Sequence, residues 1–360
     1  MKKLALVLGS LLVVGTAASA KEVVPAPVVV PEKVVEVVEK PVIVYRDREV
    51  APAWRPNGSV DVQYRWYGET ENKTVKDDTD KDWAKGENNY GRLQTTTNIN
   101  FTEKQNLNVR TRNFQELGGT SHKDSTRDTD EIRVRHHYKF GTLGSSKVDA
   151  TSRLEYRQWE DGKKRVAASV GFDFADYFFS NDYFKVDKFT LRPIYKYVWS
   201  GNNGNYSNEY GVDLETYFSL PFGFAFEFNA YNKFEDYNKK IETTKGLKGR
   251  EFKTSVEAYL YQQTNLYKNG NFAINFDFDG GYDTYNFRQH RAIKNGKVGE
   301  RRSYELYALP SIGFTYSPTD FISLYANVGA EYRNWKVTAE SKAKNWRWQP
   351  TAWAGMKVTF

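Results

Sequence analysis

Apolar and polar side chains alternate with a period of two from Gly58 to the last residue. The stretch GSVDVQYRWY is the first example, with Val60, Val62, Tyr64 and Trp66 separated by polar residues. Successive side chains of a β-strand point to opposite faces, so this pattern predicts a strand with one apolar and one polar face. The pattern recurs along the chain and predicts about fourteen strands, with sixteen as the alternative count.

The links between these segments alternate between short and long. The short links are residues 102–105, 141–146, 219–221 and 317–320, and the long ones are 68–89, 115–130, 235–250, 283–303 and 333–345. Two links fit this rule less well, because 158–162 is short and 175–187 is long. Short periplasmic turns and long external loops are typical of a transmembrane β-barrel. A soluble β-sandwich also alternates polar and apolar residues, but here nearly every strand carries charges on its polar face. We therefore expect an all-β fold, a transmembrane antiparallel β-barrel over residues 57–360.

Two segments of different composition precede the barrel. Residues 1–20 have a basic start, an apolar core and the small residues Ala18, Ser19 and Ala20, which predicts a secretory signal peptide. Residues 21–56 are rich in Val, Pro, Glu and Lys. Repeated prolines favour an extended periplasmic tether, and the alternative is a short helix through Val34 and Val37.

Composition narrows the function classes. The chain has no cysteine, so disulfides and thiol chemistry are excluded. Its formal net charge of +7 is weak and interspersed with acidic residues, and it does not suggest a nucleic-acid partner. The mean hydropathy is −0.71, and no stretch approaches the roughly 20 apolar residues of a transmembrane helix.

The polar faces of the strands would line a pore if the apolar faces meet lipid. Predicted pore-lining basic residues are Arg65, Arg92, Arg110, Arg112, Arg133, Arg135, Arg153, Arg157, Arg165, Arg192 and Lys196. Predicted pore-lining acidic residues are Asp213, Glu215, Glu227, Glu257, Asp277, Asp279, Glu305 and Glu331. Because consecutive strands are neighbours, this order predicts a basic wall facing an acidic wall and a field across the pore. The alternative is that these charges only solvate the lumen and pair across strands.

Aromatic residues near the strand ends are expected in interfacial girdles. They are Trp54, Trp66, Tyr90, Trp159, Tyr177, Tyr183, Trp199, Trp335, Trp346 and Trp348.

Signals for catalysis are weak, and we expect no enzyme activity, no metal and no cofactor. The four histidines form no HExxH motif, and GxSxG, P-loop and GxGxxG motifs are absent. His122 beside Asp124 is the one candidate for a catalytic pair. A lone histidine in a charged loop is usually solvated, and this is the role we expect for His122. Gly118 and Gly119 would allow the loop 115–130 to fold into the pore as a constriction, but a solvated external loop is the role we expect for it.

The chain ends in an alternating apolar ladder, with Met356, Val358 and Phe360 on one face. This terminal pattern resembles the signal by which the β-barrel assembly machinery recognises outer-membrane proteins. Pairing of the last strand with the first would also remove both free edges.

The chain resembles the major outer-membrane porin family of fusobacteria in MKKLALVLGSLL, in EKPVIVYRDREV and in WRPNGSV. The resemblance implies a trimeric diffusion porin of a Gram-negative outer membrane that passes small hydrophilic solutes and ions. It identifies no individual pore residue. One alternative is a surface adhesin whose external loops bind host or partner-cell proteins. Another is a specific transporter for apolar ligands, which would need an apolar plug or pocket.

Overall fold

The computed structural model describes residues 32–38, 42–48, 54–71, 89–117, 130–200, 204–294, 296–337 and 343–360. The chain divides into two compact units, Met1–Trp54 and Arg55–Phe360. The two units are described separately.

The first unit contains a β-hairpin of β1 (Glu32–Val38) and β2 (Val42–Arg48). The strands pair antiparallel from Glu32 opposite Arg48 to Val38 opposite Val42. The helical alternative for this segment is therefore wrong over the described residues. The extended conformation expected from the prolines and β-branched valines holds, but sequence reasoning did not predict that the two stretches pair.

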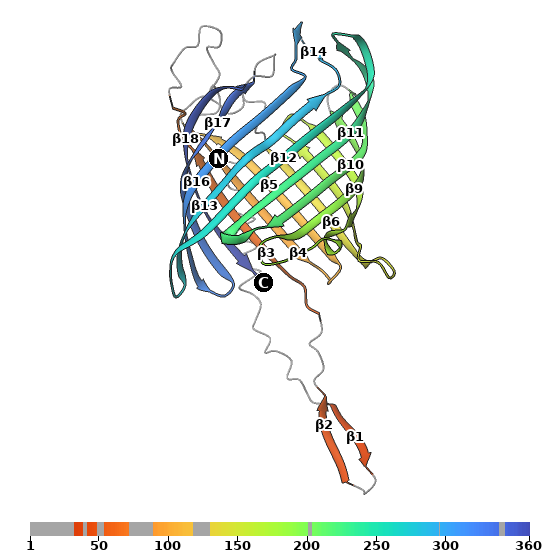
Figure 1. Ribbon diagram of the computed structural model, residues 1–360, viewed down its shortest axis with the longest axis vertical. Coiled ribbons are helices and arrows are strands. Elements are labelled where there is room, and N and C mark those ends of the chain that lie inside the picture. The colour runs from red at the N-terminus through yellow and green to blue at the C-terminus, as the bar shows by residue number, and fades with distance from the viewer. Residues whose placement is uncertain are drawn as a thin grey trace. The chain divides into compact units, whose positions relative to one another are not determined.

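The second unit is a closed antiparallel barrel of fourteen strands (Figure 1), which confirms the predicted fold class and strand count. Each strand pairs with its neighbours in sequence, and β18 pairs with β3 to close the barrel. The barrel strands are β3 (Asn57–Tyr67), β4 (Tyr90–Asn100), β5 (Gln105–Glu116), β6 (Glu131–Thr142), β7 (Asp149–Trp159), β8 (Lys163–Asp173), β9 (Lys185–Ser200), β10 (Tyr206–Ser219), β11 (Phe224–Thr243), β12 (Gly246–Asn269), β13 (Phe272–Arg288), β16 (Arg302–Thr319), β17 (Ile322–Val337) and β18 (Ala343–Thr359).

The closing pair of strands reaches the end of the chain. The Phe360 N–H donates to the Gly58 carbonyl, and the Gly58 N–H donates to the Phe360 carbonyl at 2.8 Å. A Cβ at position 58 would lie 2.2 Å from the Asn98 carbonyl oxygen, so only glycine fits between β4 and the terminal residue. The last residue is thus held by the backbone ladder of the first barrel strand.

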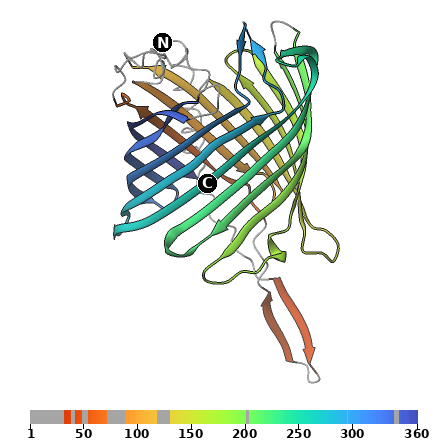
Figure 2. The ribbon, with the colours of Figure 1, turned by 45° about the horizontal axis from the view of Figure 1, so that its top comes forward.

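The predicted long link 235–250 is wrong. β11 and β12 continue as a paired hairpin to Thr243 opposite Gly246 (Figure 2). This part of the sequence carries polar residues on both faces, so its period-two signal is absent although its backbone is extended. The predicted link 283–303 also contains structure, the short hairpin of β14 (Ile293–Lys294) and β15 (Lys297–Val298).

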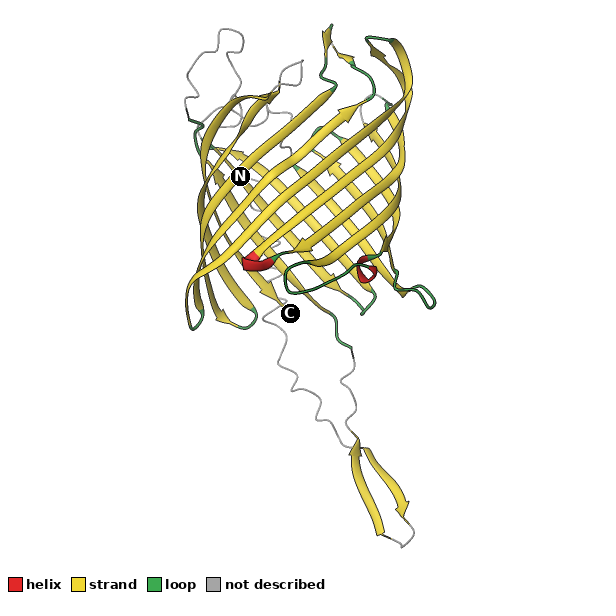
Figure 3. Cartoon of the chain, in the orientation of Figure 1, coloured by secondary structure: helices red, strands yellow, loops and turns green. Residues whose placement is uncertain are grey.

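The predicted link 175–187 is ordered around a single 3₁₀ turn, η2 (Ala175–Tyr177). A second turn, η3 (Pro221–Gly223), joins β10 to β11, and both turns lie at the same rim of the barrel in Figure 3. Among the residues the structure describes, no helix is long and apolar enough to span a bilayer.

Burial in the barrel is the reverse of that in a water-soluble protein. Leu154, Val328 and Val212 on the outer face are 56%, 55% and 45% exposed. The largest fully buried side chains are polar, namely Gln349, Glu251 and Thr351. An apolar exterior around a polar interior suits hydrocarbon outside and water inside.

Candidate functional site

The barrel encloses a polar cavity of about 760 Å³. Its lining comes from nine consecutive strands, β5 to β13. Seven of the eleven predicted basic residues line it, and so do four of the eight predicted acidic ones: Arg110, Arg133, Arg135, Arg153, Arg157, Arg165, Lys196, Asp213, Glu215, Glu227 and Glu257. The remaining lining is mostly polar and includes Lys188, Asn229, Tyr231, Lys233, Ser255 and Thr284.

Four arginines stand side by side across β5, β6, β7 and β8. Arg110 is directly opposite Arg133, Arg133 is opposite Arg157, and Arg157 is opposite Arg165. We call these four residues the arginine row. Like charges directly opposite each other on a sheet face repel, so the arrangement needs compensating anions.

Two buried carboxylates supply part of this compensation. Glu131 is 6% exposed and forms ion pairs with Arg110, with Arg157 and, at 3.8 Å, with Arg112. Glu155 is 7% exposed and accepts a hydrogen bond from Arg165 Nε at 3.0 Å. Arg133 differs from the rest of the row, because its hydrogen bond is to the neutral Asn108 Oδ1 at 3.1 Å and its Nε has no partner among the residues that the structure describes.

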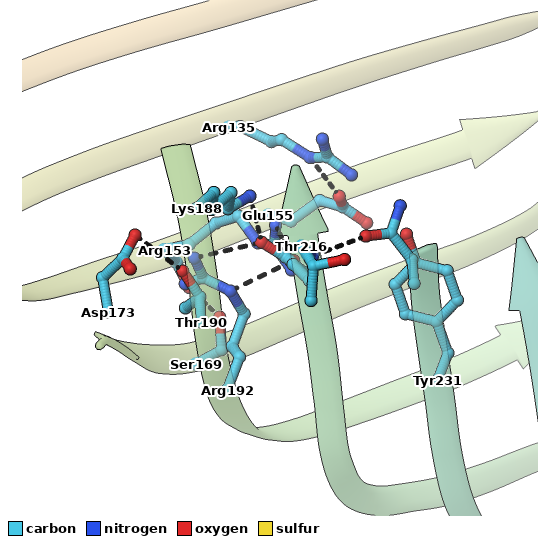
Figure 4. Close-up of polar contacts among 12 residues, drawn as sticks. Arg135, Arg153, Glu155, Ser169, Asp173, Lys188, Thr190, Arg192, Thr216 and Tyr231 are labelled. Atoms are coloured by element: carbon cyan, nitrogen blue, oxygen red, sulfur yellow. Dashed lines mark hydrogen bonds and ion pairs between the residues drawn. The ribbon is translucent and has the colours of Figure 1, made fainter. Parts of the chain in front are cut away.

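Glu215 is the centre of a third cluster, whose basic members Arg153, Lys188 and Arg192 are labelled in Figure 4. Its carboxylate lies 3.1 Å from Arg153, 2.7 Å from Lys188 Nζ and 3.2 Å from Arg192 Nε. Arg153 comes from β7, three strands away from β10 around the barrel, so this contact crosses the interior. Glu215 was predicted for the acidic wall, but its contacts place it within the basic side.

Five carboxylates on the other side of the barrel are held by neutral donors. Tyrosine hydroxyls donate to them in five pairs: Tyr231 to Glu257 at 3.0 Å, Tyr261 to Glu227 at 2.9 Å, Tyr307 to Asp279 at 2.7 Å, Tyr259 to Asp283 at 3.0 Å and Tyr325 to Asp61 at 2.6 Å. We call this set the tyrosine–carboxylate wall. No Lys or Arg of the described chain forms an ion pair with these five carboxylates. The hydroxyls orient the carboxylates and leave their negative charge in place.

The other predicted residues lie outside the cavity lining. Arg65 forms an ion pair with Glu331 at 3.5 Å and lies over the Trp353 ring at 4.9 Å. Arg92 lies over the Tyr67 ring at 5.9 Å. The two acidic residues that remain have different partners. Asp277 accepts a hydrogen bond from Gln263, and Glu305 forms an ion pair with Arg333 at 2.9 Å.

Sequence reasoning missed two kinds of residue here. Glu131 lies at the start of a strand and was not assigned to either face, although it shares its parity with Arg133 and Arg135. The inward tyrosines were missed because tyrosine was taken as a girdle or lipid-facing residue. Their parity was the available signal, since Tyr259 and Tyr261 alternate in register with Glu257.

Three residues predicted for the aromatic girdles lie on the inner face instead. Tyr90 is 2% exposed and stacks on Tyr67 with ring centroids 4.5 Å apart. Arg157 lies 4.5 Å from the Trp159 ring, and Arg333 lies 3.8 Å from the Trp335 ring. Cation–π contact with the inner arginines explains the inward position of both tryptophans.

The described part of the chain contains no group of His, Asp or Glu side chains arranged to hold a metal ion. The predicted constriction at Gly118 and Gly119, and the pair His122 and Asp124, lie outside the described residues.

The closed barrel, its apolar exterior and its charged interior define a transmembrane β-barrel of the outer-membrane type. No protein-family model and no curated protein matches the sequence. Solved structures of similar fold include a bacterial polysaccharide outer membrane secretin, with 11% identity over 84% of this chain and 98% of that one and a TM-score of 0.41. The outer membrane channel DcaP of Acinetobacter baumannii has 11% identity over 85% and 96% of the two chains, with a TM-score of 0.38. An anion-selective porin from Comamonas acidovorans has 8% identity over 85% and 99%, with a TM-score of 0.34.

Proposed function

We propose that this protein is an outer-membrane porin, a water-filled channel for passive diffusion of small hydrophilic solutes and ions. One observation carries the proposal: the interior of the closed barrel holds a cavity of about 760 Å³ lined by charged and polar side chains. An interior of this kind lowers the barrier for hydrated solutes and raises it for apolar ones.

The charges of the cavity favour solutes that carry both signs. Within the described residues, Arg133 has no carboxylate partner, and it lies in the same cavity as Glu227 and Glu257, which have no cation partner there. A field between these two sides would align dipolar solutes along it as they pass. We therefore propose Arg133, Glu227 and Glu257 as the residues that set selectivity, with the other lining residues acting through pairing.

Planar-bilayer recording of the purified, refolded protein tests the channel function. We expect stepwise conductance that rises with salt concentration. Failure of the folded barrel to conduct would overturn the proposal and leave the adhesin alternative in first place. Loop deletions that abolish cell binding while conductance persists would then show that binding is a separate property.

Replacing Arg133 tests the selectivity assignment. Arg133→Gln removes one uncompensated positive charge from the cavity, so the reversal potential in a salt gradient should move toward cation preference. Lys104→Gln is the control. Lys104 lies in the short link between β4 and β5, so this substitution removes the same charge outside the cavity. An equal shift in both variants would contradict a pore-lining role for Arg133.

The proposal also covers the processing, location and assembly of the chain. We infer that residues 1–20 are cleaved as a signal peptide, that residues 21–56 stay in the periplasm, and that Met356, Val358 and Phe360 engage the β-barrel assembly machinery. The sequence resemblance to the fusobacterial porin family supports a homotrimer in the outer membrane. Host or partner-cell proteins are proposed only as ligands of the external loops.

A further inference from the structure

The barrel has a second pocket, which we call the rim pocket. Its volume is about 330 Å³, and its lining includes Lys163, Val198, Ser207, Glu235, Tyr237 and Lys240, from β8, β9, β10 and β11. Three of these residues lie one inward position beyond a residue of the charged cavity: Lys163 beyond Arg165, Val198 beyond Lys196, and Glu235 beyond Lys233. Lys163 is the first residue of β8 and the turn η2 follows the last, so the rim pocket lies toward the rim opposite to the 3₁₀ turns in Figure 3.

A bulge in β11 gives the rim pocket one of its walls. The register between β11 and β12 shifts between Asp236 and Ile241, which leaves the residues between them outside the regular ladder. Asn238 joins this bulge to the start of β10, because its side chain accepts from the Tyr206 N–H at 2.9 Å and donates to the Gly204 carbonyl at 2.9 Å. Bulges commonly re-aim side chains next to functional sites. The wall is therefore held in place by hydrogen bonds across the pocket.

Two lysines of the rim pocket have no anionic partner. Lys163 and Lys240 line it, and neither forms an ion pair within the described residues. Lys163 Nζ lies 5.4 Å from the centroid of the Trp159 ring. The carboxylate that lines the pocket, Glu235, is already bound by Lys253 Nζ at 2.6 Å. The rim pocket thus offers positive charge to a solute, and an oxyanion is the group that ammonium groups bind most strongly.

Neutral groups complete the rim pocket. Val198, Ser207 and Tyr237 are directly opposite one another, in one row across β9, β10 and β11. The Ser207 hydroxyl donates to Glu235 at 2.9 Å and can accept a hydrogen bond from a ligand. The Ser200 hydroxyl, one inward position beyond Val198, has no hydrogen bond within the described residues. Apolar walls with a few polar groups are typical of small-molecule sites, whose volumes are roughly 300–1,000 Å³.

We propose that the rim pocket binds a small organic acid that carries hydroxyl groups, such as a sugar acid. Lys163 and Lys240 would hold its carboxylate, the two serines would bind its hydroxyls, and the Tyr237 ring would contact its carbon body. The inference rests on the proposed channel function, because it assigns the site that such a solute occupies before it reaches the charged cavity from this rim. The next inward residues toward the cavity, Arg165 and Lys196, are also basic.

Calorimetric titration of the folded protein in detergent with D-glucuronate tests the inference without reference to conductance. We expect binding to the native chain and at least about tenfold weaker binding to Lys163→Gln and to Lys240→Gln. Lys164→Gln is the matched control and should keep the native affinity. Lys164 is the next residue of β8 and points to the outer face, so this substitution removes the same charge outside the rim pocket.

Two further ligands and bilayer recording separate the possible outcomes. Glucose lacks the carboxylate and acetate lacks the hydroxylated body, so each should bind at least about tenfold more weakly than glucuronate. Equal affinity for either one, or an equal loss of affinity in Lys164→Gln, would overturn the inference. A native chain that conducts ions but does not bind glucuronate would also overturn it. Binding of glucuronate by a chain that does not conduct would support the site and overturn the channel function.

Discussion

Glu131 shows how one side chain makes the arginine row feasible. Its carboxylate is buried and bound by Arg110 and Arg157, which stand on either side of Arg133 in the row. Without it, neighbouring guanidinium groups would face each other with only water and Glu155 to reduce their repulsion. The number of arginines in the sequence therefore overstates the net positive charge on the inner face of the barrel.

Neutralising this carboxylate should change both stability and selectivity. In Glu131→Gln, charge-assisted hydrogen bonds are lost and three arginines lose a partner, so the free energy of unfolding should fall by about 1–3 kcal/mol. The uncovered positive charge should move the reversal potential toward anion preference. Glu103→Gln, in the exposed link between β4 and β5, provides the control. A Glu131→Gln channel that prefers cations more than the native one would contradict this account.

The tyrosine–carboxylate wall predicts a different residue effect. Tyr307→Phe keeps the ring but removes the hydroxyl that donates to Asp279 at 2.7 Å. We therefore expect the free energy of unfolding, measured in urea, to fall by about 1–2 kcal/mol. Tyr316→Phe on the same strand is the matched control, because its hydroxyl has no hydrogen bond within the described residues and its side chain is 48% exposed. Equal effects in the two variants would mean that the hydroxyl of Tyr307 does not stabilise the barrel.

At the scale of elements, alternation was enough to predict which face of each strand is polar. It predicted Val60 and Val62 on one face and Arg65 on the other, and the pairing of β3 with β18 and β4 agrees with that division. Alternation could not predict the register, because a period of two gives the face of a residue but not which residue of the neighbouring strand lies opposite it. The arginine row and the carboxylates that bind it follow from register, so no reading of single strands could have found them.

The extension of β11 and β12 escaped prediction for a related reason. Residues 237–249 are polar on both faces, as suits strands that continue into water beyond the membrane, so no alternation marks them. The extension should then be dispensable for the barrel. Replacing residues 237–249 by Asn-Gly, so that a two-residue hairpin turn joins the paired Asp236 and Arg250, should leave a folded barrel with unchanged conductance. Resistance of the folded band to detergent at room temperature and bilayer recording would check this, and loss of folding would show that the extension contributes to the barrel core.

At the scale of the whole molecule, the order of charges in the sequence becomes an order around the barrel. Basic residues dominate β5 to β9, and four carboxylates held by tyrosine lie on β11 to β13, namely Glu227, Glu257, Asp279 and Asp283. The predicted division into two walls is thereby refined, because Glu131, Glu155 and Glu215 neutralise much of the basic side, while the five carboxylates of the tyrosine–carboxylate wall form no ion pair within the described residues. Composition gives the number of charged residues, whereas the register of the closed sheet determines which of them form ion pairs.

Closure of that sheet also gives Phe360 two separable roles. Its backbone completes the ladder with Gly58, and its ring is 58% exposed at the rim of the barrel. Phe360→Ala keeps the backbone bonds and removes the ring, whereas Phe360→Tyr keeps an aromatic ring. If the ring is the assembly signal, Phe360→Ala should lower the amount of folded protein in the outer membrane several-fold, and Phe360→Tyr should not. Refolding of both variants in detergent should be near native, because most β3–β18 pairs, from Thr351 with Tyr67 to Thr359 with Ser59, remain in each. A Phe360→Ala variant that assembles normally in cells would assign the terminal residue to barrel closure alone.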